Sequence, residues 1–244
     1  MQIQVACHAH SEWSYDAKWT LEALSKKFAA DGYRVLMMTE HDRGFSPERL
    51  RELRAACDAV SSDSFLVVPG IEYSDAANQV HVLVWGEVPF LGEGLPTSDM
   101  LRQVKSCNGV AVWAHPSRRN AWQNFEPSWS EALLGIELWN RKYDGWAPSE
   151  TAGPLLLRAG AVPFVGLDFH TAKQSFPLAM VLDLDEAVSE RAILECMRAR
   201  RLHARAFGMP LNRALFRKAV PVMGIAEHAR RRAASVVKQA RKRF

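Results

Sequence analysis

Six of the eight histidines and three carboxylates of this 244-residue chain stand at or beside the ends of short apolar runs. These residues are His8, His10, His41, Asp42, Glu72, His81, His115, Asp168 and His170. Imidazole and carboxylate groups together suit transition metals, whereas a carboxylate that closes an apolar strand is costly unless it is paired or bound to a metal. The pattern therefore predicts a metal site built from strand ends.

Two pairs of donors have a single residue between them, His8 with His10 and Asp168 with His170. Side chains of a strand alternate between its faces, so both members of such a pair point the same way. One HxH pair is weak evidence, since two polar residues at a strand edge would give the same pattern. Repetition along the chain favours metal binding, and the donors outnumber what one ion can use.

We therefore expect two to three divalent transition-metal ions, which the donor types restrict to Zn²⁺, Mn²⁺ or Fe²⁺. Magnesium and calcium are disfavoured because they prefer shells made entirely of oxygen. Glu72 is a candidate for a carboxylate that bridges two ions, as in two-metal hydrolytic sites.

The elements that would position these donors alternate between β-strands and α-helices. We expect strands near residues 2–7, 33–39, 65–72, 79–85, 110–114, 135–139, 161–167 and 177–183, and a short last strand at 202–207. Helices are expected at 20–31, 47–61, 98–107, 149–159 and 186–200, with Ser46 as an N-cap and Pro47 in the first turn. Such βα units predict a largely parallel sheet, and seven or eight of them would close an α/β barrel with its chemistry at the carboxyl ends of the strands.

Composition agrees with one α/β catalytic domain, because 48% of the residues are hydrophobic. The N-terminus lacks the pattern of a signal peptide, and no apolar stretch approaches a membrane span, so we expect a cytoplasmic protein without a transmembrane segment. The four cysteines, Cys7, Cys57, Cys107 and Cys196, form no CxxC pair. They indicate neither a disulfide framework nor a thiolate zinc site, and buried apolar packing is their expected role.

Seven short motifs follow one another between about residue 3 and residue 207: HAHSEWSYD, TEHD, PGIEYS, HVLVWG, AHPSR, GIELWN and GLDFH. In this order they resemble the polymerase and histidinol phosphatase (PHP) family of metal-dependent phosphoesterases. The resemblance implies a distorted (β/α)7 TIM-like barrel with a trinuclear metal site. One ion would be held by His8, His10, Glu72 and Asp168, a second by Glu72, His81 and His115, and a third by Asp16, His41 and His170.

The chain departs from the family pattern at three positions. Glu40 stands where the family often has Asp, and Leu167 and Phe169 replace the common small residues of a GSDAH-like motif. We expect Phe169 to narrow the space beside the metals or to make it more apolar.

The expected activity is hydrolysis of a phosphate mono- or diester by a hydroxide that bridges metal ions in the trinuclear site. A small phosphate ester and an oligonucleotide both fit as substrates. Candidate phosphate-binding residues are Arg118, Arg119, Arg141 and Lys142, although the last three fit solvated surface charges at least as well. Trp13, Trp139 and Trp146 fall near the expected site and fit either stacking on a sugar or base or packing in the core. His203 and His228 belong to no motif.

The charge of the chain is divided between an acidic body and a basic tail. Residues 1–197 carry 17 Lys and Arg against 26 Asp and Glu, whereas residues 198–244 carry 14 against one. We expect a catalytic domain at residues 1–207, a linker near 208–210 and a basic helical extension at 208–244, with an apolar stripe from Val222 onward. The helix would pack on the barrel or contact anionic lipid, nucleic acid or a partner protein.

Two rival functions remain open from the sequence. Amidohydrolase-like barrels, which hydrolyse C–N bonds, also begin with an HxH strand and end with an aspartate. A non-catalytic metal-binding or nucleic-acid-associated module is the other rival. The TEHD motif, the PGIE glutamate and the DxH ending favour the phosphoesterase.

Overall fold

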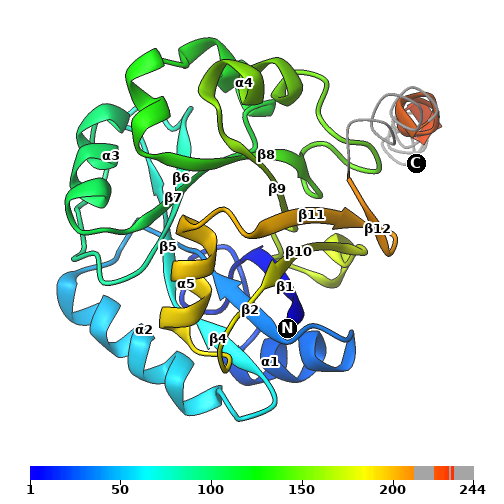
Figure 1. Cartoon of the computed structure of the whole chain (residues 1–244). Helices are drawn as coiled ribbons and strands as arrows, with labels where there is room; N and C mark the ends of the chain where they lie inside the picture. The colour runs from blue at the N-terminus through cyan, green and yellow to red at the C-terminus, as the bar shows by residue number, and fades with distance from the viewer. Residues whose placement is uncertain (212–222, 231, 234–244) are drawn as a thin grey trace, which may run out of the picture.

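A computed structural model describes residues 1–211, 223–230 and 232–233 as a mixed α/β fold (Figure 1). Its strands are β1 (Gln2–Ala9), β2 (Val35–Met38), β3 (Glu40–His41), β4 (Leu66–Val68), β5 (Gly70–Ser74), β6 (His81–Trp85), β7 (Val110–Ala114), β8 (Leu133–Asn140), β9 (Val162–Gly166), β10 (Leu178–Asp183), β11 (Leu202–Ala206) and β12 (Met209–Pro210). They form two six-stranded sheets, in the orders β12-β11-β10-β1-β2-β4 and β3-β5-β6-β7-β8-β9.

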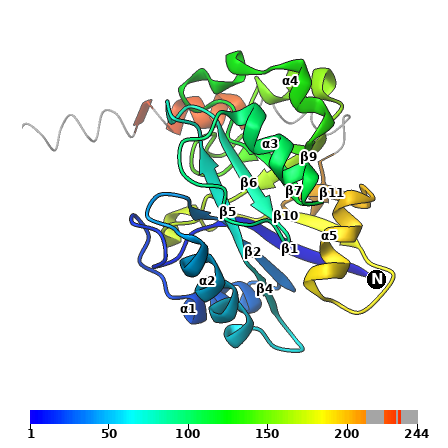
Figure 2. The same ribbon diagram turned by 90° about the vertical axis from the view of Figure 1, so that its left-hand side faces the viewer.

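The helices lie outside the strands. They are α1 (Leu21–Ala30), α2 (Pro47–Val60), α3 (Thr97–Ser106), α4 (Ala152–Ala159) and α5 (Glu190–Arg198), with short 3-10 helices η1 (Arg118–Asn124), η2 (Pro127–Glu131) and η3 (Ala172–Gln174). Helices α1 and α2 pack on β2 and β4 of the first sheet, and α3 and α4 pack on β7 and β8 of the second (Figure 2). The predicted cap of α2 is confirmed, since the Ser46 side chain accepts a hydrogen bond from the Arg49 amide.

The prediction of a largely parallel sheet is wrong at β10 and at β6. Strand β10 pairs antiparallel with both β1 and β11. Strand β6 pairs antiparallel with both β5 and β7, whereas β1 with β2, β7 with β8, and β8 with β9 are parallel. The connection from Ser74 to His81 is too short for a crossover helix, so the chain turns back on itself. His81 therefore reaches the same rim as the other donors from the beginning of its strand, not from the end.

Two of the expected strands are each divided between the sheets. Thr39 separates β2 from β3, and Pro69, which has no backbone N–H to donate to a ladder, separates β4 from β5. The chain is closely packed at the second break. A Cβ atom at Gly70 would lie 2.4 Å from the Trp85 ring, so a side chain at this position would clash with the ring. The Trp85 indole N–H donates to the Met38 carbonyl across this junction, at 2.8 Å.

The two sheets also meet where the chain leaves β9 and runs beside the end of β1. The amides of Leu167 and Phe169, just after β9, donate to the carbonyls of Cys7 and His8, and the His10 amide donates to the Phe169 carbonyl. No continuous ladder between β9 and β1 is present among the described residues, so the pairing brings the strands together only at this rim. The residues after β9 are thereby held against the residues that end β1.

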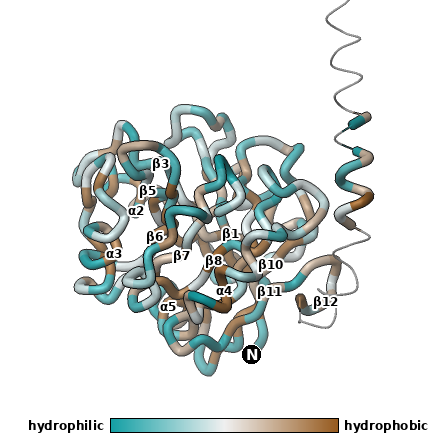
Figure 3. The backbone as a smooth tube through the Cα atoms, turned by 90° about the horizontal axis from the view of Figure 1, so that it is seen from above, coloured by the Kyte–Doolittle hydropathy of each residue, from teal (hydrophilic) through white to brown (hydrophobic). Residues whose placement is uncertain are grey.

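Helix α5 covers the opposite end of the strands. It packs on β10 and β7, and its Leu194 side chain lies next to Gly86, just after the end of β6 that is remote from His81. Hydrophobic residues run along the strands in the middle of the molecule (Figure 3), where they form one buried cluster. The closed end and the packed core leave the opposite rim as the place for a site.

The linker predicted near residues 208–210 coincides with a short strand. Strand β12 pairs antiparallel with β11, so this stretch forms the turn and the second strand of a hairpin. Residues 223–230 and 232–233 are helical, and the remainder of the predicted tail helix lies outside the described residues. Among the residues described, no helix has both the length and the apolar composition that a membrane span requires.

Candidate metal centre

The nine residues that the family resemblance implies as metal ligands lie together at one rim of the strands. Eight of them have buried side chains, and Asp16 is the more exposed member. Three overlapping triads among them have ligand atoms within 4.8 Å of one another: His8, His10 and Asp168; His8, Glu72 and His115; and His10, His41 and His170. Buried donors at this spacing are able to hold divalent metal ions.

One set of converging donors comes from the end of β1, which supplies His8 and His10, and from Asp168 after β9. The Nε2 atoms of His8 and His10 lie 3.5 and 3.4 Å from Oε2 of Glu72, and 3.8 and 3.6 Å from Oδ1 of Asp168. Neither Nε2 atom has a hydrogen-bond partner among the described residues, although both are buried. Ligands about 2.1 Å from a tetrahedral ion are about 3.4 Å apart, so these four atoms are spaced like the ligands of one ion.

Unusual backbone conformations aim three of these donors. The φ angles of His8, Asp168 and His115 are 63°, 47° and 28°, in the left-handed region that non-glycine residues rarely occupy. At His8 the ladder between β1 and β2 has a bulge, so the simple alternation expected for the HxH pair does not hold. His8 and His10 nevertheless converge, with ring centroids 5.3 Å apart. Strain of this kind is concentrated at functional sites.

Glu72 is the centre of the cluster. Its Oε1 atom lies 2.7 Å from Nδ1 of His81 and 2.9 Å from Nε2 of His115, while its Oε2 atom lies 3.1 Å from Nδ1 of His41. Burial alone would raise the pKa of the Glu72 carboxyl, but the surrounding histidines hold this pKa well below its usual range. The carboxylate therefore stays ionised and available to cations on both of its oxygens.

Asp16 closes the solvent side of the cluster. Its two oxygens lie 3.3 Å from Nε2 of His41 and 3.2 Å from Nε2 of His170. Partial burial opposes ionisation, but the hydrogen bonds from these two histidines lower the pKa of Asp16. Burial alone would lower the pKa of His41, but its hydrogen bonds to Asp16 and Glu72 raise this pKa to about 10. In contrast, burial and the neighbouring His41 and His170 lower the pKa of His10 well below its usual value, so this ring is neutral.

Comparisons with known proteins bear on the fold that carries this cluster. Neither protein-family models nor curated proteins gave a match to the sequence. Among solved structures, a two-domain protein from Bacteroides vulgatus that contains a predicted PHP-like metal-dependent phosphoesterase matches with a TM-score of 0.67 at 18% identity, over 88% of this chain and 68% of the other. The chain has a PHP-like fold.

Two further matches have different activities in their names. The lesion-specific endonuclease PfuEndoQ from Pyrococcus furiosus matches with a TM-score of 0.57 at 14% identity, over 82% of this chain and 56% of the endonuclease. An amidohydrolase from Chromobacterium violaceum matches with a TM-score of 0.51 at 16% identity, over 81% and 96% of the two chains. At these identities the likeness concerns the fold, so the activity must be argued from the site.

Within this PHP-like fold, Glu137 of β8 is a site residue that the sequence analysis missed. Its Oε1 atom accepts from Nδ1 of His8 at 2.8 Å, and its Oε2 atom accepts from the His115 amide at 2.7 Å and from the Asn140 amide group at 2.8 Å. Glu137 thus orients one predicted ligand and the backbone of another. The available signal was a carboxylate inside the apolar run LLGIELWN, which is costly without a partner.

Glu40 organises the other side of the cluster. It accepts hydrogen bonds from the Ser11 amide and from the hydroxyls of Ser11 and Ser14. The Ser14 oxygen in turn accepts from the His41 amide at 3.0 Å and lies 3.3 Å from Nδ1 of His10. Because the Ser14 proton is directed at Glu40, His10 donates from Nδ1 and keeps the lone pair of Nε2 for the cluster.

Asp42, which the strand-end pattern included, does not join the nine residues. Its carboxylate accepts from the Ser74 amide at 3.0 Å and so ties the end of β3 to β5. Burial raises the pKa of Asp42 to about 6. This residue is a structural carboxylate beside the cluster.

The four predicted phosphate-binding residues separate into two groups. Lys142 reaches the cluster, with Nζ 3.1 Å from Oδ1 of Asp168. Arg118 lies at its edge and donates to the backbone and side-chain oxygens of Asn78, whose side-chain oxygen lies 2.6 Å from Nε2 of His81. Arg119 also donates to the Asn78 carbonyl but is exposed, whereas Arg141 donates to the Lys173 carbonyl. Of the four, Lys142 and Arg118 are the cations that lie at the cluster.

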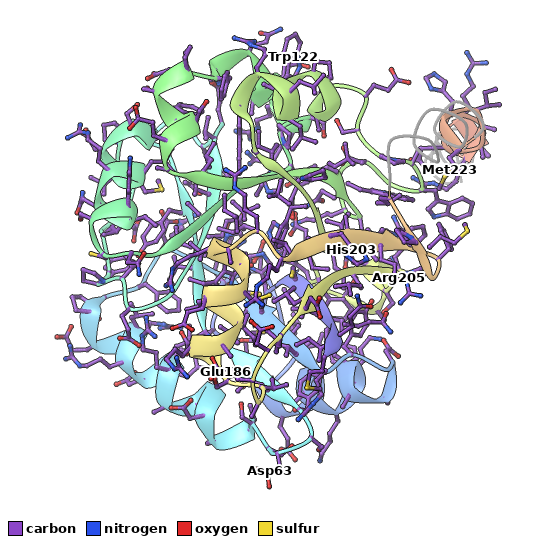
Figure 4. The ribbon with its side chains drawn as sticks, viewed as in Figure 1. Asp63, Trp122, Glu186, His203, Arg205 and Met223 are labelled. Atoms are coloured by element: carbon purple, nitrogen blue, oxygen red, sulfur yellow. The ribbon has the colours of Figure 1, made fainter. Side chains whose placement is uncertain are left out.

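The expectation for Phe169 is wrong. Its ring is buried against Phe28 and Trp19, at centroid distances of 5.3 and 5.6 Å, so it packs under α1 and not beside the nine residues. The bonds that pair Phe169 with β1 turn its side chain to the core face. Trp139 is likewise fully buried and packs in the core, in agreement with one of its two expected roles. Figure 4 shows His203 on β11, a strand that supplies none of the nine residues.

Proposed function

We propose that this protein is a metal-dependent phosphoesterase with a trinuclear site on a distorted barrel of seven strands. The observation that carries this proposal is the convergence of nine histidine and carboxylate side chains, in which the buried Nε2 atoms of His8 and His10 have no hydrogen-bond partner among the described residues. Nine donors are too many for one ion but suit three ions that share ligands. Binding of a single divalent ion would need only part of these nine donors.

We assign the ligands by proximity and by the family resemblance together. His8, His10, Glu72 and Asp168 would hold one ion, Glu72, His81 and His115 a second, and Asp16, His41 and His170 a third. The acidic oxygens are ionised and His10 is neutral, as ligands require, whereas His8 and His41, whose pKa values are raised by neighbouring carboxylates, would release a proton when metal binds. Bound divalent ions would supply Lewis acidity, both to lower the pKa of an attacking water and to neutralise charge on phosphate oxygens.

The residues of the chain itself supply charge and orientation around that centre. Lys142 is held by Asp168, and Arg118 is held by Asn78, so both cations are fixed before a substrate arrives. A phosphate group at the cluster would gain charge-assisted hydrogen bonds from them. Glu137 and Ser14 keep His8 and His10 in the orientation that exposes Nε2. This cationic rim favours a phosphate over a neutral amide as the group that is cleaved.

The decisive experiment combines metal analysis with a screen of phosphate esters. Purified wild-type protein should contain bound transition metal and hydrolyse at least one ester when Mn²⁺ is supplied. His10→Ala or Asp168→Ala should remove metal and abolish the activity, while circular dichroism shows an intact fold. His203→Ala, on a strand outside the site, is the matched control. Wild-type protein without transition metal by elemental analysis contradicts the proposal.

Hydrolysis of a C–N bond is the second candidate, because an amidohydrolase is among the structures of similar fold. The same preparation tested on amides and on phosphate esters separates the two. Turnover of an amide without turnover of any phosphate ester would replace the phosphoesterase proposal.

A further inference from the structure

A cavity of about 720 Å³ opens next to the candidate metal centre. Arg118 and Tyr143 line it, and they connect it with the cluster, since the Tyr143 ring centroid lies 4.7 Å from that of His115. Its other walls come from the loop between β8 and α4 and from the C-terminal helical residues 223–230. A volume of this size is typical of a pocket for a small organic ligand, within the usual range of about 300 to 1,000 Å³.

The helical residues 223–230 are anchored to the loop that follows β8. The buried carboxylate of Glu227 accepts a hydrogen bond from the Trp146 amide at 3.1 Å. Arg230 donates a hydrogen bond of 2.7 Å to each oxygen of the same carboxylate, and its guanidinium lies over the Trp146 ring. Met223, labelled in Figure 4, packs on the hydrophobic core at the beginning of the segment. The segment is thus attached at both ends.

Gly145 makes this attachment possible. A Cβ at this position would lie 2.3 Å from Oε1 of Glu227, and the φ angle of Gly145 is 78°. Any side chain here would both strain the backbone and push the Glu227 carboxylate out of place. The loop after β8 therefore matches the C-terminal segment in shape as well as in hydrogen bonding.

The wall that faces the metal side is cationic and the remaining walls are polar. Arg118 and Arg119 line the cavity together with the polar side chains of Ser149, Thr151 and His228, and the carboxylates of Asp144, Glu150 and Glu227 also belong to its walls. Few large apolar side chains line the space, so a polar group of sugar or nucleoside size suits it better than a lipid chain.

We propose that residues 223–230 form a wall of the substrate cavity and select phosphate esters that have a polar leaving group of sugar or nucleoside size. This inference rests on the phosphoesterase function proposed above. Glu227 is its positioning residue, because it holds the wall without being part of the metal cluster. The basic C-terminal region thereby has a role at the active site through its single acidic residue.

Glu227→Ala in the full chain tests the proposal through three measurements. Trypsin should cleave after Arg230 at least about tenfold faster than in wild type, because the segment loses its anchor. The KM for a nucleoside 5′-monophosphate should rise about tenfold, while kcat/KM for the smaller 4-nitrophenyl phosphate changes less than about twofold. Bound metal should stay at the wild-type level. Glu48→Ala is the matched control, since Glu48 makes an exposed (i, i+3) pair with Arg51 on α2.

Each result has a definite meaning. Equal effects on both esters, or no effect on either, would overturn the assignment of a selective wall. An unchanged rate of tryptic cleavage would overturn the role of Glu227 as its anchor. Gly145→Ala disrupts the same contact from the other side and should reproduce the effects of Glu227→Ala. Agreement between the two variants shows that the effects come from loss of this contact. If wild-type protein hydrolyses no phosphate ester of the screen, the proposed function fails, and the cleavage rates still decide whether Glu227 anchors the segment.

Discussion

Oε1 of Glu137 lies 2.8 Å from Nδ1 of His8, and both side chains are fully buried. The bond keeps Nδ1 of His8 turned toward Glu137 and leaves Nε2 facing Glu72 and Asp168. Burial would lower the pKa of His8, but the carboxylates of Glu137, Asp168 and Glu72 raise it well above the usual value. One contact between β1 and β8 therefore controls a donor that two of the three possible metal triads share.

Glu137→Gln should weaken metal binding by about 10- to 100-fold, the usual effect of removing a hydrogen-bond partner behind a ligand. If the glutamine oxygen accepts the hydrogen bond from His8, its NH₂ group faces the His115 amide and the Asn140 side chain. Both of these groups are donors, so the hydrogen bonds that they make to Glu137 would be lost. Metal titration followed by elemental analysis measures the effect. Glu186→Gln, an exposed residue near α5, should bind metal as wild type does. Unchanged affinity in Glu137→Gln would show that this bond does not support the site.

Gly166→Ala should disturb the same contact from the backbone side. A Cβ on Gly166 would lie 1.7 Å from Oε1 of Glu137 and 2.9 Å from Cβ of His8, and both of these side chains are buried. We expect a loss of about 2 kcal/mol or more in the free energy of unfolding together with weaker metal binding. Urea denaturation of the metal-free protein measures the first effect. Gly224→Ala, whose Cβ would lie 4.0 Å from Oε1 of Glu150 and meet no nearer atom of the described residues, should cost little and is the control.

Metal uptake should depend on pH through His41, whose pKa is raised to about 10. This ring is protonated at pH 7 in the metal-free protein, so a metal ion that binds it must displace a proton. Apparent affinity should then rise with pH by up to about tenfold per unit for each proton released, up to about pH 10. Calorimetry of Mn²⁺ binding in buffers of different ionisation enthalpy measures the release. A binding enthalpy independent of the buffer would contradict the prediction.

The same shift predicts how the stability of the metal-free fold changes with pH. His41 has a higher pKa in the folded chain than in the unfolded chain, so protonation stabilises the fold. Its contribution is fully present below about pH 6.5 and is lost as the pH rises through about 10. His41→Gln should flatten this part of the profile in chemical denaturation at a series of pH values, whereas His203→Gln should leave the profile unchanged.

Lys142→Met should lower kcat/KM for a phosphate ester by about 10- to 100-fold without removing metal. The variant keeps the stem of the side chain but removes the charge that lies beside Asp168. Steady-state kinetics and elemental analysis on one preparation separate the two effects. Lys173→Met removes a neighbouring exposed charge and should retain full activity. If Lys142→Met loses its metal as well, Lys142 supports the metal centre and does not act on the substrate.

Much of the candidate site was predictable from local sequence. Seven of the nine residues close apolar runs or follow them directly, whereas His81 begins its strand and Asp16 was implied only by the family resemblance; strand ends that share a rim bring such residues together. Helix α2 could be placed from Ser46 and Pro47 because capping is a local interaction between neighbouring residues. Both predictions depend on periodicity and spacing, which are properties of short segments.

Other features depended on which segments pair with one another. The reversal of β6, the turn of Phe169 into the core and the approach of Glu137 to His8 all join residues from different strands. Glu227, a lone acidic residue in a basic tail, has a partner only because the loop at Gly145 leaves room for it. A local pattern states that a polar residue needs a partner, but only the packing of distant strands decides which residue that partner is, because burial and hydrogen bonding are satisfied by whatever the fold brings within reach.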